Sequence, residues 1–212
     1  MKNWKGRSNI TIHQMDCLEA MKGMEDNVFD LAIVDPPYGM GNKFKGGKSG
    51  KMNFNEVVEK GWDNEIPPPE YFEELQRVSK NQIIWGGNYF GLPSTRGFVI
   101  WDKKQPFPNF SACEYAWMSF NVVSKIFVLT STRTGDTNKI HPTQKPVKLY
   151  EWLLMNYAKE GDRILDTHLG SGSHALACWN LNFDLTAYEL DPDYFEATAK
   201  RIEKHTRQIQ MF

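Results

Sequence analysis

The chain has 212 residues, a formal net charge of −1 and a hydrophobic content of 41%. This length suits one full α/β domain with its own core and is short for two, so we expect a single domain over residues 1–212. The near-zero charge excludes a protein that attracts polyanions through its overall field. Any contact with nucleic acid must therefore come from local patches.

Cysteine spacing and the start of the chain indicate the compartment. Cys17, Cys113 and Cys178 lie far apart without a Cys-x-x-Cys pair, which argues against a zinc site or a disulfide framework and for a reducing environment. The first residues lack the apolar core of a signal peptide, and no run approaches the roughly 18 apolar residues of a membrane span. We expect a soluble, cytoplasmic protein with no metal centre and no membrane contact.

The front of the chain predicts a strand, a helix and a second strand. Residues 10–15 alternate in polarity, residues 18–21 form a short helix, and residues 29–34 make an apolar, buried strand. Strands joined by a helix run parallel, so Asp16 and Asp35 follow them at the same carboxyl edge. Asp16 suits both a helix N-cap and a ligand contact, and the two roles are compatible.

The second strand runs into Asp35-Pro36-Pro37-Tyr38. Proline lacks an N–H for the sheet and holds the preceding residue extended, so this turn is stiff. The Asp35 carboxylate and the Pro36 carbonyl are two acceptors for the two N–H groups of a planar exocyclic amine. Tyr38 offers a face for a nucleobase, and such stacking contributes roughly 1–3 kcal/mol per base. The alternative is an ordinary turn that ends a strand.

Residues 39–61 combine six glycines with several cations and few apolar side chains. This composition predicts a mobile loop, and because it leaves directly from the candidate site we interpret it as a lid that contacts phosphates. A solvated loop without a role is the alternative. The candidate DNA contacts in this loop are Lys43, Lys45, Lys48 and Lys51.

The middle of the chain predicts a helix over residues 70–79, a strand over 82–85, and strands over 98–101 and 112–120 that form an antiparallel hairpin at one sheet edge. The loop over 102–110 mixes Lys103 and Lys104 with aromatics, which suits DNA contacts but also suits simple packing onto a core. Residues 119–140 carry Lys125 and Arg133 and are a candidate target-recognition insert.

A second stiff loop, residues 141–146, precedes an amphipathic helix over 147–158. Its two prolines fix its shape, while Thr143 and Lys145 supply a hydroxyl donor and a cation. This pair suits a small carboxylate. The alternative is a capped helix start with a solvated lysine.

The last part of the chain predicts a strand over 163–166, a glycine turn and a helix over 174–180, then a strand over 184–188 and a final helix from 193 to about 205. Gly170-Ser171-Gly172 lets the turn approach a ligand closely. Glu189 lies about 20 residues further on, where an acidic side chain binds ribose hydroxyls. Together these features indicate a nucleoside cofactor.

Asp166 decides which nucleoside is favoured. A dinucleotide places its pyrophosphate at this turn, where the Asp166 carboxylate would repel it, whereas S-adenosylmethionine brings an ammonium group. We therefore expect Asp166 to bind the ammonium of S-adenosylmethionine. The other groups of this cofactor also have candidate partners. Its carboxylate would be bound by Ser171 or Ser173 with Thr143 and Lys145. Glu189 would bind its ribose diol, and Asp16 its adenine amine.

With these motifs in order, the chain resembles the amino-methylating DNA methyltransferases. Asp35-Pro36-Pro37-Tyr38 matches their catalytic motif, and the stretch from Leu165-Asp166 to Gly170-Ser171-Gly172 matches their cofactor loop. Residues 141–146 resemble the segment before that loop in a permuted subgroup, in which the catalytic half comes first. Met15-Asp16-Cys17 resembles the strand end that contacts the cofactor adenine.

The resemblance implies a Rossmann-like S-adenosylmethionine-dependent α/β fold: a mostly parallel, seven-stranded twisted sheet with an antiparallel edge hairpin and helices on both faces. It implies double-stranded DNA as partner, base flipping, a place in restriction–modification in a bacterial cell or a phage-infected host, and dimerisation as is frequent in the family. His168 stands where the family usually has an aromatic. The implied catalytic residues are Asp35, Pro36, Pro37 and Tyr38, and the further cofactor contacts are Cys17, Asp35, His168 and Leu190.

Three alternatives stay open at this point. The aspartate that begins the catalytic motif favours adenine N6 within the family, but cytosine N4 presents similar geometry. A protein-glutamine methyltransferase uses a related motif, which usually begins with asparagine and follows the cofactor loop. A non-catalytic nucleic-acid-binding partner subunit would be expected to have lost part of one motif, and here both are intact.

Overall fold

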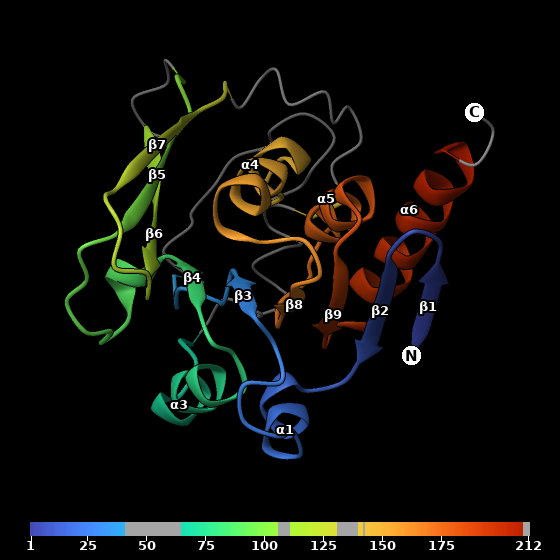
Figure 1. Ribbon diagram of the computed structural model, residues 1–212, viewed down its shortest axis with the longest axis horizontal. Helices are drawn as coiled ribbons and strands as arrows, with labels where there is room; N and C mark the ends of the chain where they lie inside the picture. The colour runs from blue at the N-terminus through green and yellow to red at the C-terminus, as the bar shows by residue number, and fades with distance from the viewer. Residues whose placement is uncertain (41–64, 106–110, 131–139, 142, 210–212) are drawn as a thin grey trace.

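The computed structural model of the chain describes residues 1–40, 65–105, 111–130, 140–141 and 143–209. Within these residues nine strands form one sheet, in the order β1-β2-β9-β8-β3-β4-β6-β5-β7 (Figure 1). The strands are β1 (Lys2–Lys5), β2 (Asn9–Gln14), β3 (Leu31–Val34), β4 (Gln82–Trp85), β5 (Phe98–Asp102), β6 (Cys113–Met118), β7 (Lys125–Val128), β8 (Arg163–Asp166) and β9 (Asp184–Glu189). The helices are α1 (Cys17–Lys22), α3 (Pro69–Val78), α4 (Val147–Tyr157), α5 (Ser173–Leu181) and α6 (Pro192–Ile209), with a 3-10 turn, η2, at Gly87–Tyr89.

The centre of the sheet is parallel. β2, β9, β8, β3 and β4 are neighbours that run in one direction. β6 is antiparallel to both β4 and β5, which leaves β5 aligned with the central strands, and β7 is parallel to β5. The predicted mostly parallel sheet is confirmed. The carboxyl ends of the five central strands share one edge, which is the edge where open α/β sheets bind ligands.

Two details of the predicted sheet are wrong. It has nine strands instead of seven, because β1 pairs antiparallel with β2 at one end and β7 pairs with β5 at the other. The predicted hairpin of β5 and β6 exists, but β7 covers its outer side, so the hairpin is not the edge. Part of the predicted insert at residues 119–140 therefore belongs to the sheet, and residues 131–139 lie outside the described residues.

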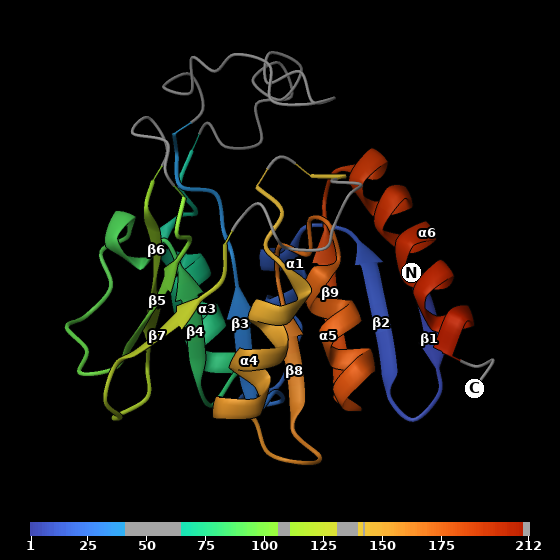
Figure 2. The ribbon, with the colours of Figure 1, turned by 90° about the horizontal axis from the view of Figure 1, so that it is seen from above.

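Helices cover both faces of the sheet, as predicted. Figures 1 and 2 show α4, α5 and α6 on one face and α1 and α3 on the other. β3 is buried along its whole length because both of its faces are covered. Among the described residues, no helix has both the length and the apolar character that a membrane crossing requires.

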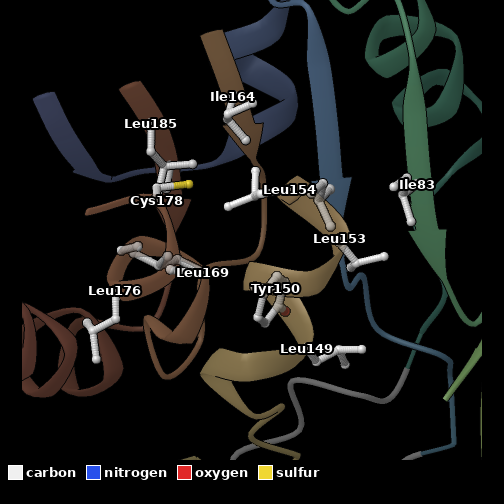
Figure 3. Close-up of a cluster of buried hydrophobic side chains, with 14 of the residues drawn as sticks. Ile83, Leu149, Tyr150, Leu153, Leu154, Ile164, Leu169, Leu176, Cys178 and Leu185 are labelled. Carbon is white, nitrogen blue, oxygen red and sulfur yellow. The ribbon is translucent and has the colours of Figure 1, made fainter. Parts of the chain in front are cut away.

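The core on the α4 and α5 face fixes the strands that carry the cofactor motif. Leu153 and Leu154 of α4, Ile164 of β8 and Cys178 of α5 are all fully buried, and Figure 3 shows them in one cluster of buried hydrophobic side chains. Burying each such leucine contributes about 1.5–3 kcal/mol. This packing places the end of β8 firmly between β9 and β3.

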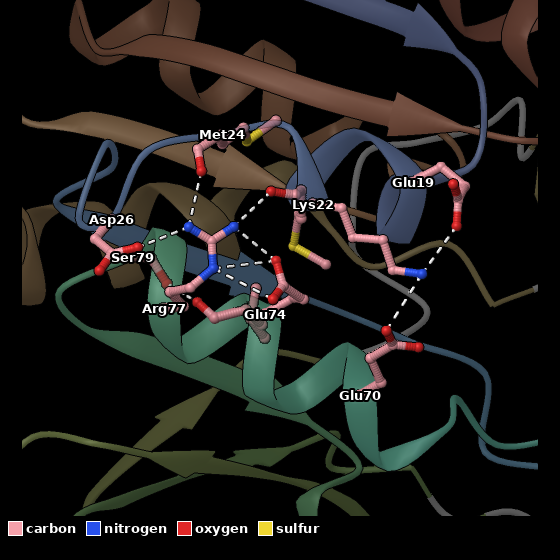
Figure 4. Close-up of polar contacts among 10 residues, drawn as sticks. Glu19, Lys22, Met24, Asp26, Glu70, Glu74, Arg77 and Ser79 are labelled. Carbon is pink, nitrogen blue, oxygen red and sulfur yellow. Dashed lines mark hydrogen bonds and ion pairs between the residues drawn. The ribbon is translucent and has the colours of Figure 1, made fainter.

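An arginine cluster joins the helices of the other face (Figure 4). Arg77 of α3 donates to the carbonyl oxygens of Met21 and Met24, each at 2.8 Å, at the end of α1. It also pairs with Asp26 and Glu74, each at 2.7 Å. Carbonyls at a helix end lack intrahelical partners, so Arg77 satisfies them and ties α1 to α3. The strand end at Asp16, which precedes α1, is thereby held against the sheet.

Candidate active site

Two turns that are far apart in sequence meet at the carboxyl edge of the sheet. β3 and β8 are parallel neighbours that pair Ala32 with Leu165. The chain leaves β3 at Asp35, and β8 ends at Asp166. Because parallel strands end at the same edge, the Pro-Pro turn after β3 and the glycine turn after β8 both begin at this edge. The structure thus brings together the two motifs that the sequence singled out.

Asp35 is held from two sides. Its Oδ1 accepts a hydrogen bond from the Tyr38 hydroxyl at 2.7 Å, and its Oδ2 pairs with the Lys145 ammonium. Burial raises the pKa of Asp35, and the nearby Lys145 charge opposes this rise. A carboxylate has about four acceptor positions, so two remain for an amine.

Lys145 pairs with protein carboxylates, a contact that sequence reasoning missed. Its side chain is 3% exposed, and its Nζ also lies 3.1 Å from Oε2 of Glu114 on β6. Burial lowers the pKa of Lys145, but the charges of Asp35 and Glu114 outweigh burial and raise it. Glu114 in turn pairs with Lys103 at 2.5 Å. The role predicted for Lys145, binding a cofactor carboxylate, stays a prediction.

Tyr38 is packed tightly by aromatic neighbours. Its ring stacks on Tyr89, with centroids 5.0 Å apart, and meets the edge of Phe90. Gly86, with φ of +69°, passes beneath the ring, and a Cβ there would lie 2.2 Å from Cε1 of Tyr38. Burial raises the pKa of Tyr38 far above its usual value, so the phenol keeps its proton and remains a donor to Asp35. Tyr89, which sequence reasoning did not select, is thus part of this site.

The glycine turn is built around Glu189. The Gly170 amide donates to Oε2 of Glu189 at 2.9 Å, and the Asp191 amide donates to Oε1 at 3.0 Å. Burial raises the pKa of Glu189, while these two hydrogen bonds oppose the rise. Gly172 has φ of +75°, and a Cβ there would lie 2.6 Å from Cγ2 of Thr198. Leu190, beside Glu189, is 65% exposed at the same edge.

Asp166 is buried and oriented by its own neighbours. Its Oδ1 accepts from the His168 amide at 3.0 Å, and its Oδ2 lies 3.0 Å from Nδ1 of His174. The His174 ring stacks on Tyr150 of α4. Sequence reasoning missed His174, although its place two residues after the glycine turn, in the first turn of α5, is a signal that could have found it.

His168 also has a defined environment. Its Nδ1 lies 2.9 Å from the Thr167 hydroxyl, which in turn lies 2.6 Å from the Tyr71 hydroxyl of α3. Burial lowers the pKa of His168 to about 4, so the imidazole is neutral near neutral pH. At this position a neutral imidazole is closer to the uncharged aromatic side chain that the resemblance leads us to expect than a charged imidazolium would be.

The end of β2 carries Asp16 as predicted. Asp16 accepts from the Leu18 and Glu19 amides at 2.8 and 3.0 Å, so its predicted N-cap role is confirmed. Cys17 follows it, and burial raises the pKa of its thiol to about 12. Because β2 pairs with β9 and β9 with β8, the ends of these strands place Asp16, Glu189 and Asp166 along one edge.

The hydroxyls predicted to bind a carboxylate lie in two groups. Thr143 is exposed, and its Oγ1 lies 3.1 Å from Nδ1 of His141. Ser171 and Ser173 are buried with their hydroxyl oxygens 3.1 Å apart. Arg201 of α6, which sequence reasoning missed, donates to the Ser171 carbonyl at 2.8 Å and to the Ser173 hydroxyl at 3.0 Å.

The cations predicted to bind DNA are only partly described. Lys43, Lys45, Lys48, Lys51 and Arg133 lie outside the described residues. Lys103 pairs with Glu114, as above, and Lys104 pairs with Asp102 at 2.8 Å. Lys125 of β7 donates to Asn156 at 2.7 Å. Each of these three lysines therefore has a partner within the protein, and their contact with DNA stays a prediction.

Comparison with known proteins shows which proteins the chain resembles. The model of the N6/N4 DNA methylases matches residues 104–201, which hold Lys145, Asp166 and Glu189 but not Asp35. The type II methyltransferase M.HpaI of Haemophilus parainfluenzae is 26% identical over 235 residues, covering 89% of this chain and 72% of that protein. Both comparisons support the adenine-N6 and cytosine-N4 DNA methyltransferases as the family that this chain resembles.

Solved structures of DNA methyltransferases share the fold of this chain. The crystal structure of the M1.HpyAVI–SAM complex aligns with a TM-score of 0.62 at 20% identity, covering 91% of this chain and 98% of that one. The PvuII DNA methyltransferase, described as cytosine-N4-specific, aligns with a TM-score of 0.62 at 15% identity, covering 94% and 91%. The predicted α/β class is thereby confirmed.

Proposed function

We propose that this methyltransferase transfers a methyl group from S-adenosylmethionine to the N6 amino group of an adenine flipped out of duplex DNA. The observation that carries the proposal is the meeting of two turns at one sheet edge. The Asp35 turn presents acceptors for an amine, and the Asp166 loop, on the neighbouring strand, presents acidic groups to a cofactor. A methyl donor and an amine acceptor would then share one cleft.

The acidic edge supports S-adenosylmethionine as the cofactor. Asp16, Asp166 and Glu189 end neighbouring strands, and each is oriented by backbone amides. Three such acceptors suit a ligand with an ammonium, ribose hydroxyls and an adenine amine, and they disfavour a pyrophosphate. In our assignment Asp166 holds the ammonium, Glu189 the ribose diol and Asp16 the adenine amine. When bound, this cofactor supplies an electrophilic methyl group on its sulfonium.

The hydroxyls near the glycine turn would complete the cofactor site. Thr143 is exposed and available to a ligand, and the Ser173 hydroxyl is oriented by Arg201. We assign the cofactor carboxylate to these hydroxyls together with Ser171. Gly170 and Gly172, both at positive φ, let the backbone pass close to the ligand without a side chain in the way.

The chemistry at the base follows from the acceptors of the front turn. The amino group of adenine is a poor nucleophile because its lone pair is delocalised into the ring. Asp35 and the Pro36 carbonyl would accept hydrogen bonds from its two N–H groups. The lone pair would then be directed at the methyl carbon. As the new N–C bond forms, the S–C bond breaks with its electron pair left on sulfur. One proton then leaves nitrogen for Asp35 or water, and positioning supplies most of the rate gain.

Cytosine N4 is the second candidate acceptor, because the family includes enzymes for both amines. We favour adenine because the motif begins with aspartate, Asp35, which favours adenine N6 within the family. Since M.HpaI is a type II methyltransferase, we place this enzyme in restriction–modification.

One experiment tests the proposal. The protein is incubated with S-adenosylmethionine labelled in its methyl group and with duplex DNA, RNA or a protein extract, and the labelled polymer is hydrolysed and identified by mass spectrometry. We expect N6-methyladenine in DNA. N4-methylcytosine would make cytosine the target base instead of adenine. Label in RNA or protein would assign a different class of substrate. No label in any polymer would support the non-catalytic partner subunit.

A further inference from the structure

A chain of alternating charges extends from the catalytic turn to the third strand away from it. Lys145 lies between Asp35 of the β3 turn and Glu114 of β6, and Glu114 lies between Lys145 and Lys103. The Lys145 side chain is 3% exposed, against 17% for Asp35 and 24% for Glu114. The buried cation is therefore shared by two carboxylates, only one of which faces the proposed reaction.

The second carboxylate matters because a buried cation without a partner is strongly unfavourable. If Asp35 were the sole partner of Lys145, taking up a proton would leave the Lys145 charge unbalanced. With Glu114 at 3.1 Å from Nζ, the ammonium keeps an anionic partner whatever the protonation state of Asp35. Glu114 itself stays ionised, since the charges of Lys145 and Lys103 outweigh its burial and lower its pKa.

Glu114 also limits how strongly Lys145 competes for Asp35. An ammonium has three donors, and here they are divided between two carboxylates and the Tyr38 hydroxyl, 3.4 Å away. Without Glu114, Lys145 would turn wholly to Asp35. The Asp35 oxygen would then be a weaker acceptor for an amine hydrogen.

We propose that Glu114 is a positioning residue for methyl transfer, which acts through Lys145 to keep Asp35 available as an acceptor of the amine hydrogens and of the released proton. This inference rests on the proposed function, because it assigns Asp35 to the amine. In the step concerned, the N–H bond of the methylated amine breaks, its electron pair stays on nitrogen and the proton joins the Asp35 carboxylate. The proton passes to water when the product leaves.

The pKa of Asp35 depends on the ionisable groups that face it. Tyr38 and Lys145 bond to it, Glu114 acts from β6, and the phenols of Tyr71 and Tyr150 approach from α3 and α4. Burial raises the pKa of all three tyrosines far above the usual value, so they stay neutral where carboxyl groups titrate. The charged groups of this cluster are therefore Asp35, Lys145, Glu114 and Lys103.

The test compares Glu114→Gln with a matched control, Glu74→Gln. Glu74 is also an ion-paired, partly buried carboxylate, with 20% exposure, but it pairs with Arg77 away from the site (Figure 4). The pKa of Asp35 is measured by carbon NMR of the side-chain carboxyl in the full chain without cofactor. We expect a lower pKa in Glu114→Gln than in wild type, because a like charge has been removed, and no change in Glu74→Gln.

Single-turnover methylation across pH gives the functional readout. In Glu114→Gln we expect the maximal rate to fall about tenfold, within the range that proton transfer contributes. The acid limb of the profile should move to lower pH, while cofactor affinity by calorimetry stays within about twofold of wild type. An unchanged rate and an unmoved acid limb in a folded variant would overturn the role of Glu114.

A second variant keeps the test decisive if Glu114→Gln does not fold. In Lys103→Gln, Lys145 is the cation of this cluster that still pairs with Glu114. Lys145 should then move toward Glu114 and away from Asp35. The pKa of Asp35 should rise as a result. A pKa of Asp35 that does not rise in Lys103→Gln contradicts the inference. Wild-type protein that methylates no DNA would instead refute the proposed function, so the two failures are distinguishable.

Discussion

Gly86 and Tyr38 fit together with no room for a side chain between them. Gly86 has φ of +69°, and a Cβ on it would lie 2.2 Å from Cε1 of the Tyr38 ring. The residue that follows β4 therefore passes with its backbone directly beneath the aromatic ring of the Asp35–Tyr38 turn. The position of Tyr38, after β3, thus depends on a glycine at position 86, after β4.

Gly86→Ala should displace Tyr38 and break its hydrogen bond to Asp35. Strain at positive φ costs about 1–3 kcal/mol, to which the steric clash adds. We expect methyl transfer to fall at least about tenfold and urea unfolding to show reduced stability. Gly91→Ala is the control, because a Cβ there meets nothing within 4 Å. Equal activity in the two variants would show that the Tyr38 position is unimportant.

Gly172→Ala should weaken the cofactor site more than the fold. The added Cβ would press on Thr198 at 2.6 Å and shift the glycine turn. Gly161→Ala shares the positive φ, of +87°, but its Cβ meets nothing within 4 Å, so it controls for backbone strain. Calorimetry should show cofactor affinity reduced about tenfold or more in Gly172→Ala only. A similar loss in both variants would attribute the effect to strain and not to the turn.

His168 should make stability depend on pH in a defined window. Burial lowers its pKa to about 4 from 6.5, so between these values the unfolded chain binds a proton that the folded chain does not. Stability is therefore lost as pH falls through this window, at up to about 1.4 kcal/mol per pH unit.

The comparison with His168→Phe isolates this contribution. Phenylalanine restores the aromatic that the family usually has and removes the titration. Urea unfolding at pH 7 and pH 5 should show a larger loss of stability for wild type than for His168→Phe. Equal losses would mean that the imidazole is protonated in the folded state as readily as in the unfolded one.

The sequence predicted the elements that are apolar and buried. The strand at Gln82–Trp85 is found with the predicted bounds, and the helix after the prolines begins at Pro69. β1 and β7 were missed because they are short edge strands whose residues are intermediate or exposed, so no buried face marks them in the sequence. Edge strands owe their pairing to a neighbour that the sequence does not reveal.

Short motifs singled out Asp35 and Glu189 in the sequence, and the structure places both at the carboxyl edge of the sheet, while their roles stay predictions. The contact of Lys145 with Asp35 was not predictable, because 110 residues separate them and only the packed sheet brings them together. Glu114 lies in a strand whose neighbours gave no signal of a charge network. Tertiary ion pairs of this kind require the strand order, which the motifs alone do not supply.

The central claim is that the front turn holds the amine while the back loop holds the methyl donor. It is tested most directly by Asp35→Ala, assayed for single-turnover methylation of DNA and for cofactor binding by calorimetry. We predict that methyl transfer falls by about 10³-fold or more, beyond the loss of proton transfer alone, while cofactor affinity stays within about twofold. Undiminished methyl transfer in a folded Asp35→Ala protein would contradict the account.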